Sequence, residues 1–490
     1  MATQWESVIG LEVHVELSTK TKVWCSCKNE FGAEPNTNVC PVCLALPGSL
    51  PVLNAQALEY AMKAGLALNC EIASYSKFDR KNYYYADLPA GYQISQYDLP
   101  LCKGGYVEIM LKDGTTKRIR LHHIHLENDA GKLVHAGDDV ASATTSLVDL
   151  NRAGVPLIEI VTEPDMRSAE EALAFLTKLR SIVKWIGVSD AKMEEGSMRC
   201  DINISLRPKG SQEFGTRAEV KNVNSFSAAV RAIEYEIKRQ AAILESGGQV
   251  EQETRSWQDA KGISVTLRTK EQAEDYRYFP DPDLPPVVLT PEDVEAVRGK
   301  LPELPDSVMA RLTQEYGLSA YDASVIVAEK EYAQWFDEAV KLAGKEYAKS
   351  IANWQINELN RVMNAKGLGP DQIPLRPEQL VGMLQLMEKG TITGKIAKTV
   401  FEKMVESGKD AETIVKEEGL SQVADEAELR KLAEEVVASN PKGVEDWKAG
   451  RKGAAQWFVG QIMKKTRGRA NPQLAMKLVE EALEKATSQE

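Results

Sequence analysis

A change of hydrophobic period near residue 290 is the feature that most constrains how this chain can fold. Up to that point, alternating apolar and polar residues, typical of half-buried strands, are mixed with helical patterns. This part closes in a proline-dense segment, YFPDPDLPPVVLTPEDV, and strand signals nearly vanish after it. We therefore expect an α+β fold in which a sheet domain over residues 1–292 is followed by helices alone.

Helical periodicity covers most of the C-terminal 200 residues. A Thr-Pro-Glu-Asp run at 290–293 is typical of an N-cap with proline in the first turn. Gly408 and Lys409 interrupt the pattern, so we expect a helical domain over 293–408 and a helical tail over 409–490. The predicted helices span 307–315, 322–343, 346–365, 376–388, 395–407, 411–418, 427–438, 453–465 and 472–486.

Composition excludes several classes of protein. With 43% apolar and 27% charged residues in 490 positions, the chain is typical of a soluble globular protein of two or three domains. No apolar run approaches the roughly 18 residues of a membrane span, and MATQWESVIGLEVHVEL lacks the pattern of a secretory signal. We expect a cytoplasmic protein without a membrane partner.

Charge is unevenly distributed along the chain. The formal net charge of −12 argues against nucleic-acid binding, because phosphates would be repelled. Residues 441–480, however, hold nine Lys or Arg against three acids, which leaves this window with six positive charges. Its central group is Lys464, Lys465, Arg467 and Arg469, which follows an amphipathic helix with Trp457, Phe458 and Ile462 on its apolar side. Such a group either contacts phosphates or is a solvated helix end.

Four of the seven cysteines fall within nineteen positions, as Cys25, Cys27, Cys40 and Cys43. In a reducing compartment this spacing favours a metal over disulfides. Two short-range pairs of thiolates are what a closed tetrahedral zinc site requires, and such a site performs no chemistry. We expect structural Zn²⁺; the alternative is four thiols without metal.

Several predicted strands carry acids and bases on one face. Around the first of them, Leu11, Val13, Val15 and Leu17 alternate with Glu12, His14 and Glu16. The same construction recurs in RCDINISL, which presents Arg199, Asp201 and Asn203, and in GTRAEVKNVNS, which presents Arg217, Glu219 and Lys221. Two further segments place acids beside bases at strand ends: HLENDAGK, with Glu127 and Asp129, and NRAGVPLIEIVTEPD, with Asn151, Arg152 and Glu159.

This repetition points to an ATP–Mg²⁺ site, in which carboxylates hold the hard cation and bases neutralise phosphate oxygens. The alternative is that these strands simply turn a polar face to water, as antiparallel sheets often do. No standard P-loop, dinucleotide or kinase motif accompanies them. A third metal arrangement, His122, His123 and His125 after a hairpin turn at Asp113-Gly114, is less favoured because the three histidines do not all share a face.

Unbroken stretches resemble the B subunits of the aspartyl/glutamyl-tRNA amidotransferases, in the order of that family. They are GLEVHVEL (10–17), FDRKNYYYADLPAGYQISQ (78–96), HLENDAGK (125–132), NRAGVPLIEIVTEPD (151–165), SMRCDINISLRP (197–208), RAEVKNVNSF (217–226) and DYRYFPDPDLPP (275–286). The stretch AAQWFVGQIMKKTRGRANPQ (454–473) is similar to the tRNA-binding tail of YqeY-type proteins.

The resemblance implies a mixed or antiparallel α+β cradle domain, a helical domain and a small helical tail. It implies ATP-dependent phosphorylation of the side-chain carboxylate of Glu-tRNA(Gln) or Asp-tRNA(Asn), then amidation by ammonia from a partner A subunit, in a heterotrimer with a small C subunit. A Ser-Ser-Lys amidase signature is missing from the sequence, which fits a glutaminase on another polypeptide.

The resemblance also implies roles for individual residues. The Mg²⁺ ligands would be Glu12, His14, Glu127 and Glu159, with Asp201 and Glu219 as candidates for a second site. Phosphate charge would be met by Lys81, Arg152, Arg199 and Lys221. The cofactor pocket would be lined by Tyr83, Gln93, Ser95, Asn151 and Asn203, the first three of which could instead line the ammonia path.

Two other functions remain open. A non-catalytic tRNA-binding scaffold would use the strand-face carboxylates only for solubility. An archaeal-type relative specialised for glutamine would carry an additional inserted domain, and no segment beyond residue 290 is left for one. The sequence does not distinguish Glu-tRNA(Gln) from Asp-tRNA(Asn) as the substrate.

Overall fold

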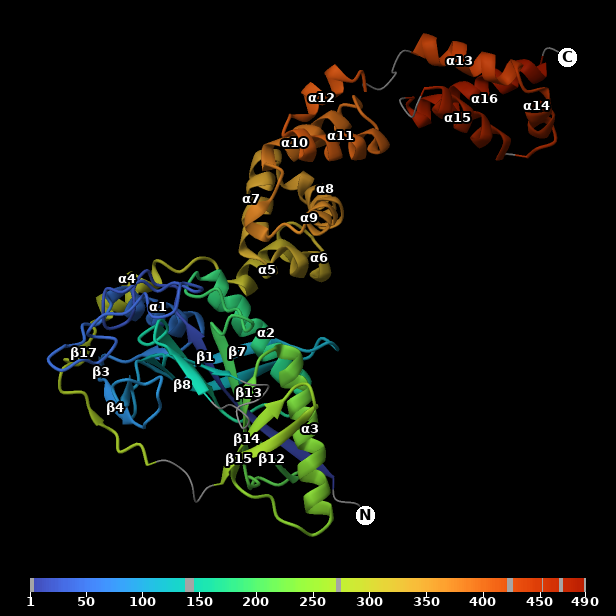
Figure 1. Ribbon diagram of the computed structural model, residues 1–490. Helices are drawn as coiled ribbons and strands as arrows, with labels where there is room; N and C mark the ends of the chain where they lie inside the picture. Colours follow the sequence, from blue (N-terminus) through green and yellow to red (C-terminus); the bar gives the residue numbers. More distant parts are fainter. Residues whose placement is uncertain are drawn as a thin grey trace. The chain divides into compact units, whose positions relative to one another are not determined.

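The computed structural model describes residues 4–136, 145–269, 275–420, 426–451, 453–466 and 470–488. The chain divides into two compact units, residues 1–305 and 306–490 (Figure 1). The first unit contains the sheets and the second is helical, so the expected α+β class is confirmed. Among the described residues, no helix combines the length and the apolar character that a membrane crossing needs.

A ten-stranded sheet forms the centre of the first unit. Among its described strands, β13 and β14 are parallel and the other neighbouring pairs are antiparallel. The order is β15 (Ile263–Thr269), β14 (Glu253–Gln258), β13 (Ala218–Val223), β12 (Met198–Pro208), β1 (Trp5–Glu16), β11 (Pro156–Thr162), β8 (Thr116–Asn128), β6 (Cys102–Lys103) and β2 (Glu71–Ile72), with β7 (Tyr106–Met110) also paired to β8.

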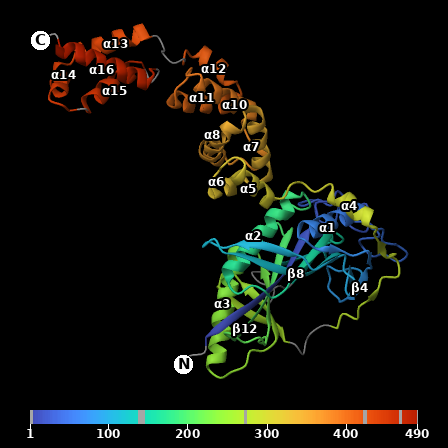
Figure 2. The same cartoon turned by 180° about the vertical axis from the view of Figure 1, so that it is seen from behind.

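One face of the sheet is the hydrophobic core. Leu11, Val13 and Val15 of β1 are fully buried there, as their alternation predicted. Helices α2 (Ala169–Trp185) and α3 (Phe226–Glu245) pack on this face through residues such as Phe175 and Ile233 (Figures 1 and 2). Each helix begins at a serine whose hydroxyl caps a backbone N–H of the first turn. The opposite face is left to polar side chains.

A small sheet lies against the end of β8. It contains β16 (Phe279–Pro280), β4 (Asp79–Asn82) and β5 (Tyr92–Ser95). Asn128 at the end of β8 joins it to the cysteine loop, because its Oδ1 accepts hydrogen bonds from Ile94 N (2.9 Å) and from Trp24 Nε1 (3.0 Å). The Asn128 carbonyl also accepts from Gln93 Nε2 at 2.8 Å. One buried amide therefore connects three segments distant in sequence.

The remaining elements of the first unit are short. Thr290 caps α4 (Pro291–Arg298) in a capping box with Asp293, which confirms the predicted helix start. This helix belongs to the first unit, where Val297 joins the core and Lys300 pairs with Glu59 at 2.6 Å. The others are α1 (Ala55–Ala67), β3 (Tyr75–Ser76) paired with β17 (Val287–Val288), and β9 (Lys132–Ala136) paired with β10 (Thr145–Asp149).

The second unit departs from the predicted helices at three places. The continuous helix expected over 322–343 is broken after Ile326, residues 354–359 are wound as a π-helix, and α14 was not anticipated. The elements are α5 (Pro305–Gln314), α6 (Ala320–Ile326), α7 (Lys330–Ala343), η2 (Lys345–Tyr347), α8 (Ala348–Asn353), η3 (Trp354–Leu359), α9 (Asn360–Lys366), η4 (Pro370–Gln372), α10 (Pro377–Glu388), α11 (Gly394–Ser407), α12 (Ala411–Glu417), α13 (Glu426–Ala438), α14 (Pro441–Lys448), α15 (Gly453–Lys465) and α16 (Pro472–Ser488).

The last four helices enclose a core of their own, which includes Leu429, Phe458, Ile462 and Leu478. Trp457, expected on the same apolar side as Phe458 and Ile462, is instead 47% exposed. Adjacent residues on a helix lie about 100° apart, so Phe458 occupies the core position and Trp457 turns outward.

A buried charged network joins α3 to β14 and β15. Glu236 is fully buried and accepts hydrogen bonds from Arg239 Nη2 (2.9 Å), Gln240 Nε2 (3.2 Å) and the Ser264 hydroxyl. Arg255 approaches the same carboxylate at 3.1 Å. Arg239 and Arg255 also pair with Glu253, so the two carboxylates and two arginines form one network that stabilises the sheet edge.

We predict that Glu236→Ala lowers the free energy of unfolding of the first unit by about 1–3 kcal/mol, because it removes a buried hydrogen-bond acceptor from Gln240 and Ser264, while Glu253 still pairs with both arginines. Denaturant unfolding followed by circular dichroism measures the effect. Glu234→Ala, at an exposed position on the same helix, is the matched control and should change it by less than about 0.5 kcal/mol. Equal losses in the two variants would contradict a stabilising network.

Candidate active site

The pairing register of five strands collects the predicted carboxylates in one row. On β1, Glu12 lies opposite Asp201 of β12, and His14 lies opposite Glu159 of β11. Asn203 of β12 is in turn opposite Glu219 of β13. Directly opposed residues point to the same face of a sheet, so the row runs across β13, β12, β1, β11 and β8.

The first group of the row consists of His14, Glu127 and Glu159, whose ligand atoms lie within 4.8 Å of one another. His14 Nε2 is 3.5 Å from Glu159 Oε2 and 4.0 Å from Glu127 Oε1. The Glu127 side chain is buried, and its Oε2 accepts a hydrogen bond from the Ser95 hydroxyl at 2.9 Å. A buried Glu127 beside a half-buried Glu159 is not what a water-facing polar surface requires, and it favours a cation site.

His125 lies between the same two carboxylates, although the sequence suggested it only in the less favoured arrangement with His122 and His123. Its Nε2 is 3.1 Å from Oε2 of both Glu127 and Glu159. Burial lowers the pKa of His125, but the two carboxylates outweigh burial and raise it to about 10. The protonated ring therefore holds one oxygen of each carboxylate and orients both groups.

The second group of the row consists of Glu12, Asp201 and Glu219, which also converge within 4.8 Å. Burial and the neighbouring Glu159 raise the pKa of Glu12, although Asn203 Nδ2 donates to its Oε1 at 2.8 Å. Lys221 Nζ contacts Asp201 Oδ2 at 2.6 Å and Glu219 Oε1 at 3.0 Å. The crowding of acids that raises the pKa of Glu12 is relieved by added positive charge, as a divalent ion supplies.

Two predicted phosphate-binding arginines meet at a different carboxylate. Arg199 Nη2 donates to Asp129 Oδ2 at 2.7 Å, and Arg152 Nε lies 3.5 Å from the same oxygen. Arg152 also donates to the carbonyls of Ala130 and Gly131. Burial and Asp129 together raise the pKa of Glu16 to about 8, so Glu16 is largely protonated at neutral pH.

A polar border along the small sheet contains three further predicted residues. Tyr83 donates to Gln93 Oε1 at 3.2 Å, and Lys81 Nζ lies 4.7 Å from the centre of the Tyr276 ring. Burial lowers the pKa of Lys81, but the charges of Glu127, Glu159 and neighbouring tyrosines outweigh burial and raise the pKa. Ser95 contacts Glu127 directly.

Asn151 lies elsewhere, beside the cysteine loop. Its Oδ1 accepts from Asn38 N at 2.8 Å, and its Nδ2 donates to the Glu34 carbonyl at 2.7 Å. Unlike the other predicted pocket residues, Asn151 uses its side chain to order the loop around the cysteines.

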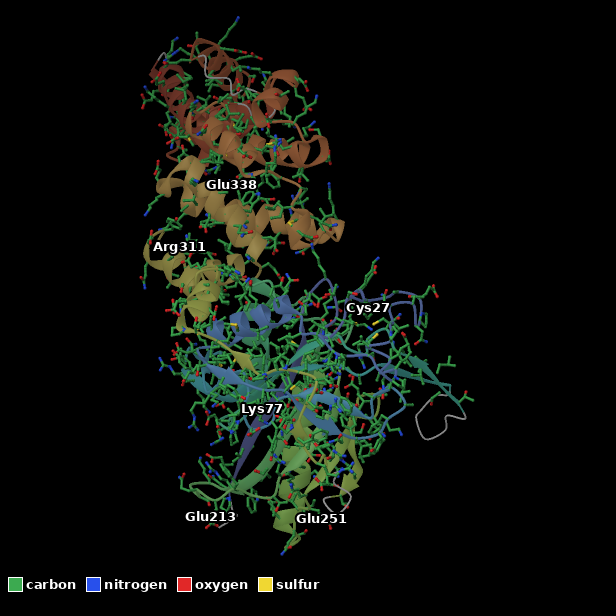
Figure 3. All side chains as sticks on the ribbon, turned by 90° about the vertical axis from the view of Figure 1, so that its left-hand side faces the viewer. Cys27, Lys77, Glu213, Glu251, Arg311 and Glu338 are labelled. Atoms are coloured by element: carbon green, nitrogen blue, oxygen red, sulfur yellow. The ribbon has the colours of Figure 1, made fainter. Side chains whose placement is uncertain are left out.

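The four clustered cysteines converge as their spacing predicted. Their sulfur atoms lie within 4.8 Å of one another, and Cys40 Sγ is 3.9 Å from Cys43 Sγ. Figure 3 shows Cys27 among neighbouring sulfur atoms on this loop. A hydrogen bond with Cys25 is the main cause that lowers the pKa of Cys43 to about 4, with a smaller contribution from the charge of Lys22. The set is compatible with tetrahedral zinc.

The environment of Lys22 fits a negatively charged metal centre. Its side chain is fully buried, and its hydrogen bond to the Leu150 carbonyl is long at 3.4 Å. A buried ammonium needs a counter-charge, and four thiolates around Zn²⁺ carry two net negative charges. This residue was not singled out in the sequence, because a lysine between threonine and valine carries no local signal.

A cavity of about 250 Å³ adjoins the second group of carboxylates. Its walls come from the polar ends of β1, β11 and β12 and from the loop that follows β12. Lining residues are Gly10, Glu12, Thr162, Asn203, Phe214 and Arg217.

Comparison with known proteins agrees with this geometry. Residues 7–295 match the model of the GatB/GatE catalytic domain, and residues 334–483 match that of the GatB domain. The chain belongs to the GatB family. Relatives named as B subunits of aspartyl/glutamyl-tRNA(Asn/Gln) amidotransferase include those of Symbiobacterium thermophilum (76% identical over 481 residues), Carboxydothermus hydrogenoformans (57% over 482) and Persephonella marina (57% over 480). These alignments cover 98% of this chain and 98%, 99% and 100% of the respective relatives.

The basic residues of the GatB-type tail are only partly described. Lys464 is exposed at the end of α15, and Lys465 forms an exposed ion pair with Glu435 at 2.5 Å. Arg467 and Arg469 lie outside the described residues.

We predict that Cys43→Ser lowers the zinc content of metal-replete protein below one per chain and lowers Tm by at least about 5 °C, because metal binding contributes directly to folding of the loop. Atomic absorption and calorimetry measure the two quantities. Because the cysteine loop performs no chemistry, the activity of the molecules that remain folded should stay close to that of wild type. Ser26→Ala, an exposed loop residue between two cysteines, is the control and should retain full zinc. Two results would contradict a structural site: less than one zinc per chain in metal-replete wild-type protein, and a Cys43→Ser variant with the same Tm as wild type.

Proposed function

We propose that this chain is the B subunit of a glutamine-dependent tRNA amidotransferase and activates the misacylated amino acid on a tRNA. The γ-phosphoryl group of ATP passes to the side-chain carboxylate of Glu-tRNA(Gln) or Asp-tRNA(Asn), which gives ADP and an acyl phosphate. Ammonia, released from glutamine by an A subunit, then attacks the acyl carbon and phosphate leaves. The products are Gln-tRNA(Gln) or Asn-tRNA(Asn), and a small C subunit completes the heterotrimer.

The observation that carries this proposal is the row of converging acids on the polar face of the sheet, with bases at its ends. Phosphoryl transfer makes few covalent demands on a protein and depends on positioning and on neutralising charge. The row supplies two groups of ligands for divalent ions, and a cavity of about 250 Å³ adjoins Glu12. A scaffold that uses these acids only for solubility would not bury Glu127 and His125.

Individual residues of this chain take distinct tasks in the proposal. His14, Glu127 and Glu159 would hold one Mg²⁺, and Glu12, Asp201 and Glu219 would hold a second; such ions would supply charge that stabilises phosphate oxygens. His125 holds the two carboxylates of the first group, and Asn203 orients Glu12. Lys221 meets the phosphate charge at the second group, whereas Lys81 lies beside the first. Arg199 and Arg152 are held in place by Asp129 at the end of β8.

We predict that Glu12→Gln and His14→Ala lower the rate of acyl-phosphate formation by at least about a hundredfold, because charge stabilisation of the transferring group is lost. Cleavage of radiolabelled ATP by the assembled enzyme with charged tRNA measures the rate. Binding of tRNA should persist in both variants. Glu108→Gln, at an exposed position on β7, is the control and should keep wild-type activity. Retained ATP cleavage in the Glu12 and His14 variants would contradict the assignment.

For the tail, we predict that charge reversal at Lys464, Lys465, Arg467 and Arg469 raises the KM for charged tRNA steeply and flattens the salt dependence of binding. Each phosphate contact that is lost means roughly one counterion fewer released on binding, so the slope of log K against log salt concentration falls by roughly one. Filter binding between 50 and 200 mM salt, about the range in which such contacts dominate, measures the slope.

Tail deletion beyond about residue 410 should have the same effect on tRNA, while glutaminase activity without tRNA stays near normal because no active-site residue is removed. The matched control reverses four exposed lysines on other helices of the second unit: Lys341, Lys349, Lys366 and Lys395. An unchanged affinity and salt slope in the tail variant would mean that the basic residues are only a solvated helix end.

A further inference from the structure

Four tyrosines flank the strands of the small sheet, and only Tyr83 among them was assigned to the pocket from the sequence. Tyr97 and Tyr278 are stacked, with ring centres 4.3 Å apart and planes inclined by 10°. Tyr276 lies 6.0 Å from Tyr278 and 6.0 Å from Tyr83. We call these four residues the tyrosine wall. Tyr97 is 63% exposed, so the outer surface of the stack is open to a further planar group.

The backbone of the wall is held in an uncommon conformation. Arg277, between the two tyrosines of segment 275–280, has a φ of +43°, which a non-glycine residue seldom adopts. Asn82 on β4 secures this kink, because its Nδ2 donates to the carbonyls of Tyr276 (3.0 Å) and Arg277 (2.9 Å). Asp275 Oδ1 accepts from Arg277 N at 3.1 Å. Strain that is compensated by dedicated contacts is typical of segments that position a binding group.

The wall lies at one end of the carboxylate row. Strand β5 connects the two, because Tyr83 donates to Gln93 Oε1 and Ser95, two residues further, donates to Glu127 Oε2. Lys81, paired with Gln93 across β4 and β5, has its Nζ 4.7 Å from the centre of the Tyr276 ring. The cavity beside Glu12 adjoins β12 and the loop after it, at the other side of the row. The two candidate binding surfaces are therefore separated by the carboxylates themselves.

We propose that the tyrosine wall binds the terminal nucleotide of the aminoacylated tRNA by stacking on its base. The side-chain carboxylate of the attached amino acid then reaches the first group of the row, His14, Glu127 and Glu159. This inference rests on the proposed function. Attacking and leaving oxygens lie roughly in line on opposite sides of a transferring phosphoryl group. If the nucleotide occupies the cavity beside Glu12, the amino acid must approach from the side of β8, where the wall lies.

The chemistry of the wall fits a nucleobase. Aromatic side chains stack on nucleic-acid bases irrespective of base identity. Lys81, next to the rings of Tyr83 and Tyr276, adds a positive charge that can contact the phosphates of a single-stranded nucleic acid. The adenine of ATP could stack on the same rings, so the experiment must distinguish binding of the terminal tRNA base from binding of ATP.

The first experiment replaces Tyr97 and Tyr278 by alanine in the full chain, assembled into the active enzyme. Stacking on one base contributes enough binding free energy that the KM for charged tRNA should rise roughly 5- to 100-fold. The Kd for ATP alone should stay unchanged. Phenylalanine at the same positions keeps the stacking surface and should restore KM to within about twofold. Tyr75→Ala, an exposed tyrosine on β3 away from the wall, is the matched control.

The second experiment uses charged tRNA whose terminal nucleotide lacks its base. The effect of a purely structural defect in the enzyme would not depend on whether this base is present. Wild-type enzyme should lose as much affinity for this substrate as the alanine variants lose for normal tRNA, and the two losses should not add. A loss of ATP affinity in the variants would assign the wall to the adenine of ATP and overturn the inference. Additive losses, or an unchanged KM, would also overturn it.

These outcomes are distinct from a failure of the proposed function. If wild-type enzyme does not cleave ATP in the presence of charged tRNA, the proposed function itself fails. If wild-type enzyme is active and the wall variants have the same KM, the function stands and the wall has another task.

Discussion

Mutual repulsion among carboxylates is the constraint on which the first unit is built. Antiparallel pairing of β1 with β11 and β12 forces Glu12, Glu159 and Asp201 onto neighbouring positions of one face. On a flexible loop these charged side chains would move apart, whereas paired strands keep them at fixed neighbouring positions. A sheet whose other face is buried against α2 and α3 cannot slip by one residue without turning its apolar side chains to water. Hydrophobic burial thereby maintains an arrangement that electrostatics alone opposes.

Around this row, nearly every basic group is already bound to an acid. Lys221 has Asp201 and Glu219, and Arg199 has Asp129. Such pairs keep the cations close to the site and offset part of the repulsion among the carboxylates. In our proposal, an incoming phosphate then competes for the same bases. Binding of nucleotide and metal together is favoured because each relieves a charge imbalance that the other would leave.

Much of this arrangement could be predicted from the sequence, and the exceptions have physical reasons. Period-two alternation places Glu12, His14 and Asp201 correctly because burial of one strand face leaves no other choice. His125 was predicted only within the less favoured histidine arrangement, and its contact with Glu127 and Glu159 was missed because Ile124 and Leu126 flank it where the strand is buried on both faces and alternation no longer separates core from site. Asn151 lies in a motif with site residues, yet its side chain bonds the cysteine loop, a tertiary contact without local signal. Trp457 and the break after Ile326 depend on packing among helices, which hydrophobic period alone does not resolve.

The single amide of Asn128 has a further consequence for the dynamics of the first unit. Its Oδ1 accepts from Trp24, next to Cys25 of the cysteine loop, and from Ile94, next to Ser95. The bond from Ile94 and the bond from Gln93 to the Asn128 carbonyl hold β5 against β8. Opening of the cysteine loop breaks the bond from Trp24 and leaves this buried side chain held from one side only, so the loop and β5 are coupled in local unfolding, and backbone amides on either side are expected to share part of the free energy of opening. The cysteine loop would in this way influence how often the polar face of the sheet opens to solvent.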